Sequence, residues 1–116
     1  QPVAVRAAQA LGLVTSGGGL TWLLDSHYGN SGVASGVGIK ILNRSGKAIN
    51  LLPDRSTTGT GNSRGWYAYQ DLTNLTSTGE VNTYTGDFTA SLEALSGQTV
   101  TPGTVNAQLQ VVVNFQ

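Results

Sequence analysis

The amino-acid sequence predicts an all-β fold, and three observations support this class. Only 10% of the 116 residues are charged and 39% are apolar, so the chain is long and apolar enough to bury one core. Its 16 glycines, among many Thr, Ser and Asn residues, favour short strands separated by turns. The last 14 residues carry apolar side chains at every second position, which is the period of a strand with one buried face.

The strand predicted at residues 103–116 is the most informative element. Its apolar face consists of Val105, Ala107, Leu109, Val111, Val113 and Phe115. The side chains between them are mostly polar, as expected if the opposite face meets water. A strand has two backbone edges, and each edge must either pair or face solvent. The surface that covers this strand is therefore the main functional question.

Shorter elements are expected in the first half of the chain. Residues 1–14 predict one or two strands, although Ala7 to Ala10 equally begins a short helix. After a glycine-rich break, residues 20–24 form a compact apolar run and residues 25–36 a loop. The clearest hairpin joins residues 37–41 to residues 48–51, through a turn in which Gly46 is expected to take a positive φ.

The second half predicts further strands around a long loop. Residues 53–65 are polar and glycine-rich, which is typical of an interaction loop or a mobile one. Residues 66–69 and 72–75 indicate another strand and its exit, and residues 83–95 a half-buried strand. The apolar face of that last strand is Phe88, Ala90, Leu92 and Ala94. Residues 100–103 turn the chain into the C-terminal strand, with Pro102 setting φ and Gly103 accepting the turn.

Charge and composition exclude several classes of function. Six basic and six acidic residues cancel, so there is no basic patch for nucleic acid. No apolar stretch approaches the ~20 residues that a membrane helix needs. The absence of cysteine excludes thiolate chemistry, cysteine zinc sites and an internal disulfide. A single histidine with scattered carboxylates predicts no metal site, and no cofactor motif is present.

The tripeptide Asp25-Ser26-His27 has the residue types of a catalytic triad. However, adjacent residues of an extended chain point to opposite faces, and the members of a triad normally come from separate segments. We therefore expect no hydrolase and no other enzymatic activity.

Three motifs, taken in order, resemble one known family. Residues 35–43, with the turn Ser45-Gly46-Lys47, resemble a "GVGI-x-L" strand and the turn after it. Phe88-Thr89-Ala90 resembles an "F-x-A" strand, and residues 100–105 resemble a "V-T-x-G" start to the last strand. From about Gly36 onward, the chain is thus similar to the C-terminal two-thirds of a chaperone-usher pilus subunit. In that family a glycine lies fourteen residues from the end and an aromatic residue is penultimate. Gly103 and Phe115 meet this pattern, although tyrosine is usual at the second position.

This resemblance implies a fold and a function. The fold would be an immunoglobulin-like β-sandwich that lacks its last strand and is completed by a donated strand. A periplasmic chaperone would first supply that strand and hold the terminal carboxylate of Gln116. The N-terminal extension of the next subunit would then replace it at an outer-membrane usher, so the groove would be bordered by Gly103 and the apolar face of residues 105–115. The protein would be part of a fimbrium on the bacterial surface that supports adhesion, with a host glycan reached through the fibre.

The resemblance does not decide the role of residues 1–36. We expect a single pilin-like domain over residues 1–116, but members of the family are longer and carry an early disulfide, so residues 1–36 match poorly. The chain is either an atypical subunit or an excerpt that lacks the first strands. Val3, Val5 and Ala7 would alternate in a donor extension or in an ordinary edge strand. Without a donor extension, the domain resembles the anchoring half of a tip adhesin.

A sugar-binding module is the rival function, because a lectin-like binder has the same composition. One aromatic and polar set for sugar contact is Trp22, His27, Tyr28 and Asn30, and another is Trp66, Tyr67 and Tyr69. The alternative role of the two tryptophans is packing in the core. Solvent-facing, coplanar rings would favour sugar binding, whereas buried rings would favour assembly.

Overall fold

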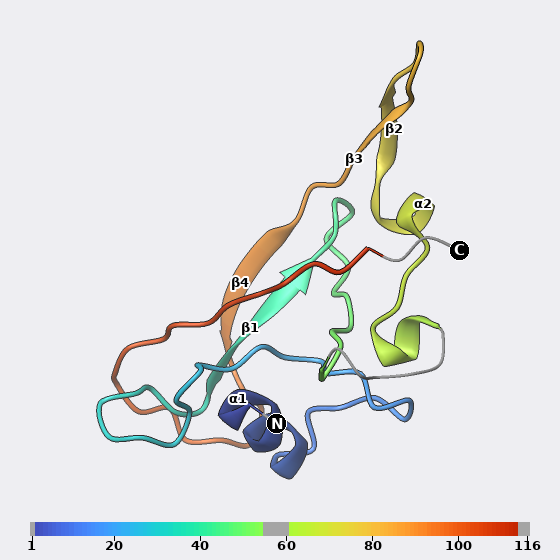
Figure 1. Ribbon diagram of the computed structural model, residues 1–116. Coiled ribbons are helices and arrows are strands. Elements are labelled where there is room, and N and C mark those ends of the chain that lie inside the picture. The colour runs from blue at the N-terminus through green and yellow to red at the C-terminus, as the bar shows by residue number, and fades with distance from the viewer. Residues whose placement is uncertain (1, 55–60, 114–116) are drawn as a thin grey trace.

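The computed structural model describes residues 2–54 and 61–113, and its strands form two antiparallel pairs (Figure 1). β1 (Val37–Leu42) pairs with β4 (Thr89–Ala94), and β2 (Asn74–Ser77) pairs with β3 (Thr83–Thr85). Short helices complete the described elements. They are α1 (Val3–Ala10), the 3-10 helix η1 (Asn62–Arg64) and α2 (Tyr69–Leu72). The antiparallel sheets confirm the predicted all-β class and are consistent with a sandwich-like fold.

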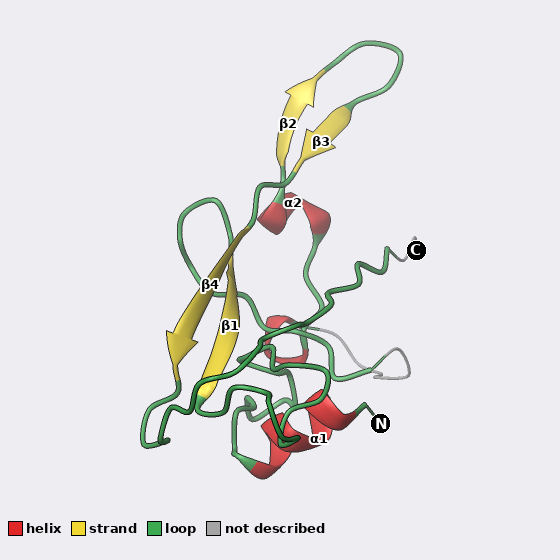
Figure 2. Ribbon diagram, turned by 90° about the vertical axis from the view of Figure 1, so that its left-hand side faces the viewer, coloured by secondary structure: helices red, strands yellow, loops and turns green. Residues whose placement is uncertain are grey.

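The molecule is extended for its size. Its radius of gyration is 15.6 Å, whereas a compact domain of this length would have a radius of about 13 Å. The β2–β3 ribbon projects from the rest of the chain in both ribbon views (Figures 1 and 2). All residues of its two strands are exposed. Much of the second half of the chain therefore lies outside any packed interior.

The core lies between α1, β1 and the segments that follow α1. Its buried apolar side chains are Val5, Ala8, Leu20, Leu24, Ile41, Leu51 and Leu95. Gly38 lies at the centre, where an added Cβ would come within 3.1 Å of a Leu24 methyl carbon and 3.2 Å of the Trp22 ring. Leu23 and Ile39 exchange two backbone hydrogen bonds of 2.8 Å, so the apolar run 20–24 lies along the edge of β1.

The first residues form a helix, so the strand prediction for residues 1–14 was wrong and the helical alternative was the better one. Val5 and Ala8, three positions apart, lie on the same helical face and are both buried. Gly12 then takes a φ of +74°, just after the C-cap at Leu11, which suits a glycine that ends a helix. The alternation of Val3, Val5 and Ala7 therefore does not form an extended donor strand in this structure.

The predicted hairpin after β1 has its turn confirmed. Asn43 Oδ1 accepts hydrogen bonds from the backbone N–H of Ser45 at 3.0 Å and of Lys47 at 2.9 Å. Gly46 has the predicted positive φ, +81°. The returning chain donates from Ile49 N–H to the Ile41 carbonyl at 2.9 Å, although residues 48–51 contribute isolated bridges instead of a continuous strand.

Two further predictions need correction, and a third is only partly covered by the described residues. Residues 66–69 are not a strand, because α2 starts at Tyr69 and the strand β2 starts only at Asn74. Residues 83–95 form two strands instead of one, and the face expected to be half-buried is exposed. The loop predicted at residues 53–65 contains η1, and residues 55–60 lie outside the described part of the chain.

The C-terminal strand is also absent over the described residues 103–113, where only Thr104 takes part in a β-bridge, with Val33. A strand requires a neighbouring strand to pair with, and the described chain places none beside residues 107–113. The apolar alternation is thus present in the sequence without its β-ladder. Phe115 and Gln116 lie outside the described residues.

Candidate functional site

One face of the β1–β4 sheet is covered over β1 and uncovered over β4. The register places Ile39 opposite Leu92 and Ile41 opposite Ala90, so these side chains share a face. Ile41 is only 6% exposed, whereas Leu92 is 60% exposed. Phe88, which precedes β4, is exposed as well. The apolar face that the sequence predicted for β4 exists, but nothing in the described chain covers it.

The backbone edge of β4 is open in the same region. β1 occupies one edge of β4, and the described residues place no strand along the other edge. An unpaired edge presents a row of N–H and carbonyl groups that an extended chain is able to bind. β4 thus offers both main-chain hydrogen bonds and an apolar face.

The C-terminal segment is held to the body of the molecule at its start. Ala34 N–H donates to the Thr104 carbonyl and Thr104 N–H donates to the Gly32 carbonyl, each at 3.0 Å. Gly103 precedes this contact so closely that an added Cβ would overlap the backbone nitrogen of Ala34. The predicted special position of Gly103 therefore has a physical reason, which is the close approach of two backbones.

Asp25 fixes the next residues of the segment. Its carboxylate is buried, and it accepts hydrogen bonds from the backbone N–H of His27, at 2.7 Å, and of Asn106. Ser26 N–H donates in return to the Asn106 carbonyl at 2.9 Å. These two N–H donors, that of Asn106 first, hold the pKa of Asp25 below its ordinary value even though burial opposes this shift. The tripeptide 25–27 thus holds backbone groups of the C-terminal segment and of its own loop.

Over the described residues 107–113, the segment forms no β-ladder. None of the described residues 107–113 belongs to a strand or a bridge, and Figure 2 draws them as a loop that leaves β1 and β4. Val111 is 82% exposed and Val113 is 68% exposed, while Leu109 is nearly half exposed. Contiguous exposed apolar side chains are a feature of protein–protein interaction sites in general. Of the residues predicted to line a groove that the structure describes, only Val105 and Ala107 are partly buried.

The first aromatic set proposed for sugar contact is engaged within the chain. The Trp22 ring packs against the core and lies 4.4 Å from Lys40 Nζ, which covers it. The Tyr28 hydroxyl accepts a hydrogen bond from Gly36 N–H at 2.9 Å. His27 and Asn30 are exposed, so the four residues do not form a platform of solvent-facing rings.

The second set is divided in a similar way. The Tyr67 hydroxyl accepts from Asn50 N–H at 2.9 Å, and Trp66 Nε1 is buried without a partner in the described structure. Tyr69 is more than half exposed, but its ring packs edge-on against Tyr84, with centroids 5.0 Å apart and planes at 80°. By the exposure criterion, these rings do not favour a stacked sugar platform.

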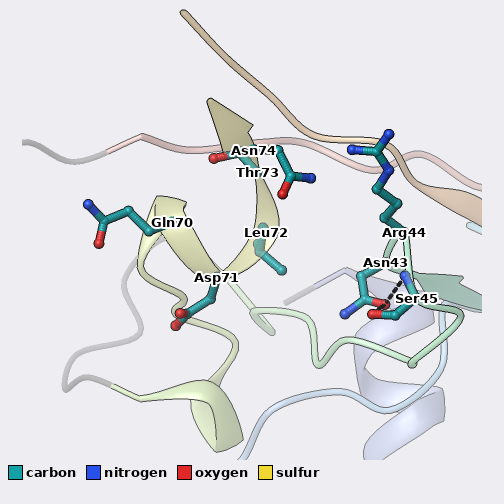
Figure 3. A pocket seen from close by; sticks show the side chains of 8 residues that line it. All are labelled: Asn43, Arg44, Ser45, Gln70, Asp71, Leu72, Thr73 and Asn74. Atoms are coloured by element: carbon teal, nitrogen blue, oxygen red, sulfur yellow. Dashed lines mark hydrogen bonds between the residues drawn. The ribbon is translucent and has the colours of Figure 1, made fainter. Parts of the chain in front are cut away.

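A polar cavity lies elsewhere, between the turn after β1 and the segment that holds α2 and the start of β2 (Figure 3). Its volume is about 410 Å³, and it is lined by Asn43, Arg44, Ser45 and residues 70–74. Arg44 Nε lies 3.8 Å from the carboxylate of Asp87. This cavity was not predictable from the sequence, because its two walls are about thirty residues apart and share no motif. In the described part of the chain no cluster of His, Asp and Glu side chains is able to hold a metal ion.

The fold and the uncovered surfaces define a class: a β protein of antiparallel sheets in which, over the described residues, the outer edge of β4 is unpaired and the apolar segment 107–113 belongs to no β-ladder. Comparison with protein families identifies the group within this class, because the family model of the fimbrial protein matches residues 4–116. The chain belongs to the fimbrial protein family. Comparison with curated proteins and with solved structures gives no match.

Membership of the family confirms the resemblance and gives the coarse function. The chain is a fimbrial pilin subunit, which is a structural and not an enzymatic kind of protein, and it assembles with other subunits into a surface fimbrium. The match also includes residues 4–34, on which the three motifs did not depend. None of the helices in the described residues is long and apolar enough to cross a membrane.

Proposed function

We propose that this pilin subunit is completed by a strand from a neighbouring subunit, and that it polymerises by exchange of such strands. The observation that carries the proposal is the apolar segment 107–113, which is exposed and has no β-partner in the described structure. Segment 107–113 would supply one edge for the incoming strand, and Leu109, Val111 and Val113 would pack against its side chains. The uncovered face of β4 would supply further apolar surface on the same subunit.

The energetics favour this proposal. Four or five apolar side chains, buried at roughly 1.5–3 kcal/mol each, would give a gross gain on the order of 10 kcal/mol before ordering costs. This gain is comparable with the stability of a whole domain. A free subunit would therefore be weakly stable and the assembled fibre durable. A periplasmic chaperone would cover the segment beforehand and bind the Gln116 carboxylate, and an outer-membrane usher would receive the complex. The resulting fibre would support adhesion.

Thermal unfolding tests the proposal. A synthetic peptide copied from the N-terminal extension of a neighbouring subunit, with apolar residues at alternate positions, is added to the purified chain. At a peptide concentration of about 100 times Kd, we expect the melting temperature to rise by roughly 10 °C. A peptide of the same composition in scrambled order should give no rise, because its apolar side chains no longer share a face.

Two variants locate the effect. Val111→Asp places a charge in the segment and should abolish the rise, whereas Val81→Asp makes the same change at a residue that is 75% exposed in the β2–β3 ribbon and should preserve it. A wild-type chain that does not respond to the peptide would contradict strand completion.

Sugar binding is the second candidate, and the observation that favours it is the polar cavity of Figure 3. Its amide, hydroxyl and carboxylate side chains are the groups that bind sugar hydroxyls. A host glycan would then contact the subunit itself. Titration of neutral oligosaccharides, followed by amide NMR shifts, tests this candidate. Shifts confined to residues 43–45 and 70–74, and lost in Asn74→Ala, would support it; uniformly small shifts would exclude it.

A further inference from the structure

Asp25 is the buried charged residue of the described chain, with only 3% of its surface exposed. A carboxylate is removed from water at high cost unless hydrogen bonds replace its hydration. Here the replacement comes from two backbone N–H groups, one from His27 in the same loop and one from Asn106, 81 positions further along the chain. Such a costly arrangement indicates that the loop is built around the contact with Asn106.

The contact holds the backbone of Asn106 from both sides. Its N–H donates to Asp25 Oδ2 and its carbonyl accepts from Ser26 N–H. Asn106 lies directly before residues 107–113, which take part in no strand or bridge. The loop at 25–27 is therefore the base from which segment 107–113 extends.

A fixed base determines which way the side chains beyond it point. Side chains alternate along an extended chain, so a slip of one residue would turn Leu109, Val111 and Val113 to the opposite face. We infer that Asp25 is a positioning residue for assembly: by clamping Asn106, it sets the register in which the segment presents its apolar side chains to an incoming strand. This inference rests on the proposed strand completion and names a residue that acts through Asn106 without touching the incoming strand.

The charged groups near the clamp are few. The His27 side chain is 73% exposed, and its Nδ1 lies 4.0 Å from Asp25 Oδ1. The backbone donors contribute more to the state of the carboxylate than this imidazole does. A test of the clamp should therefore change the carboxylate itself or the Asn106 N–H, and leave His27 in place.

The test has two readouts on the full chain. Amide hydrogen exchange of Asn106, measured by NMR without peptide, reports the clamp, and the affinity for the neighbouring-subunit peptide reports register. Asp25→Asn removes the ionised acceptor with little change of shape, so exchange at Asn106 should become at least about tenfold faster, and peptide affinity should fall by about tenfold. Asn106→Pro removes the backbone N–H donor instead and should lower the affinity for the peptide by a similar factor. Asp87→Asn, an exposed carboxylate, is the control and should change neither readout.

The results separate the two proposals. If the wild-type chain does not bind the peptide, strand completion fails, and the assembly role of Asp25 fails with it. If the wild-type chain binds the peptide but Asp25→Asn and Asn106→Pro bind it equally well, the positioning role alone is overturned, even where Asn106 exchanges faster. Unchanged exchange at Asn106 in Asp25→Asn would show that the carboxylate is not a clamp.

Discussion

The described residues before position 55 and those after position 60 differ sharply in how they place apolar side chains. The first region contains almost the whole core, from Val5 on α1 to Leu51. The second region contributes Leu95 to that core, half-buries Trp66, Leu72 and Val105, and exposes most of its other large apolar residues. These exposed residues are Tyr69, Leu75, Val81, Tyr84, Phe88, Leu92, Val100, Leu109 and Val111 to Val113. The first region folds on itself, whereas the second lacks the surface that would cover it.

The β1–β4 sheet contains both buried and exposed apolar side chains within a single pair of strands. The two strands pair in full register, from Val37 opposite Ala94 to Leu42 opposite Thr89. The difference between them therefore lies in what packs on the shared face, and not in the hydrogen bonding. On this shared face, the segments that form the core pack on β1 but do not cover β4. If a neighbouring subunit completes the fold as proposed, this boundary would separate the surface that one chain covers by itself from the surface that the neighbour covers.

The largest expected effect tests this boundary directly. Ile41→Ala should lower the free energy of unfolding by about 2–5 kcal/mol, because Ile41 is buried in the core. Leu92→Ala on the adjacent strand should change it by less than about 0.5 kcal/mol in the free chain, because Leu92 is already exposed. Urea unfolding measures both values. Equal losses of unfolding free energy at the two positions would mean that β4 is covered in solution. The contrast between β1 and β4 would then not hold.

A second effect concerns the attachment of the C-terminal segment. Gly103→Ala should destabilise the chain by roughly 1–3 kcal/mol, because the new Cβ would overlap the backbone of Val33 and Ala34. Gly79→Ala is a matched control, since Gly79 has nearly the same φ, +157° against +156°, but has open space around it. The difference between the two melting temperatures isolates the overlap. No difference would show that the segment does not approach residues 33–34 in solution.

A third, smaller effect is a dependence on acid. The N–H groups of Asn106 and His27 lower the pKa of Asp25 from its ordinary value of 3.8. A lowered folded-state pKa gives stability that is fully present above the unfolded value and is lost as the pH falls through the folded one. Urea unfolding between pH 6 and about pH 2 should show this loss in the wild-type chain and a weaker one in Asp25→Asn. Parallel profiles would indicate that Asp25 is not buried against Asn106.

The smallest effect is expected at the edge of the polar cavity. Arg44 and Asp87 are each more than 60% exposed, and their charged atoms are 3.8 Å apart. Arg44→Ala should therefore change the free energy of unfolding by about 0.5 kcal/mol or less, and added salt should reduce even that change. Urea unfolding at low and high salt measures it. A loss above 1 kcal/mol, as a rough limit, would show that this part of the second region is packed more firmly than its exposure indicates.

Features that depend on neighbouring residues were predictable from the sequence. The turn after β1 follows from Asn43 and Gly46, because its hydrogen bonds close within five residues. β1 and β4 were predictable from their alternation, although not the exposure of Leu92. Residues 3–8 have apolar side chains at spacings that fit both a strand and a helix. The structure is helical there because Val5 and Ala8 lie on one helical face and are buried against the core.

Features that depend on distant or missing partners were not predictable. The link between Asp25 and Asn106 joins positions 81 apart, and a lone Asp before Ser-His carries no signal for it. The cavity of Figure 3 joins a turn to a helix in the same unmarked way. The alternation of residues 105–115 predicted a strand, but the described chain contains no β-partner for residues 107–113, so nothing in that part of the chain forms the β-ladder that the strand would need.

The open edge of β4 has a consequence for recognition. Backbone groups are the same in every protein, so the edge by itself accepts any extended chain and cannot tell a correct neighbour from a wrong one. Discrimination has to come from the side chains beside it, and among the described residues these are led by Phe88 and Leu92. The sizes of a few apolar side chains would then determine which subunits pair in a fimbrium. The main-chain hydrogen bonds would contribute affinity but no specificity.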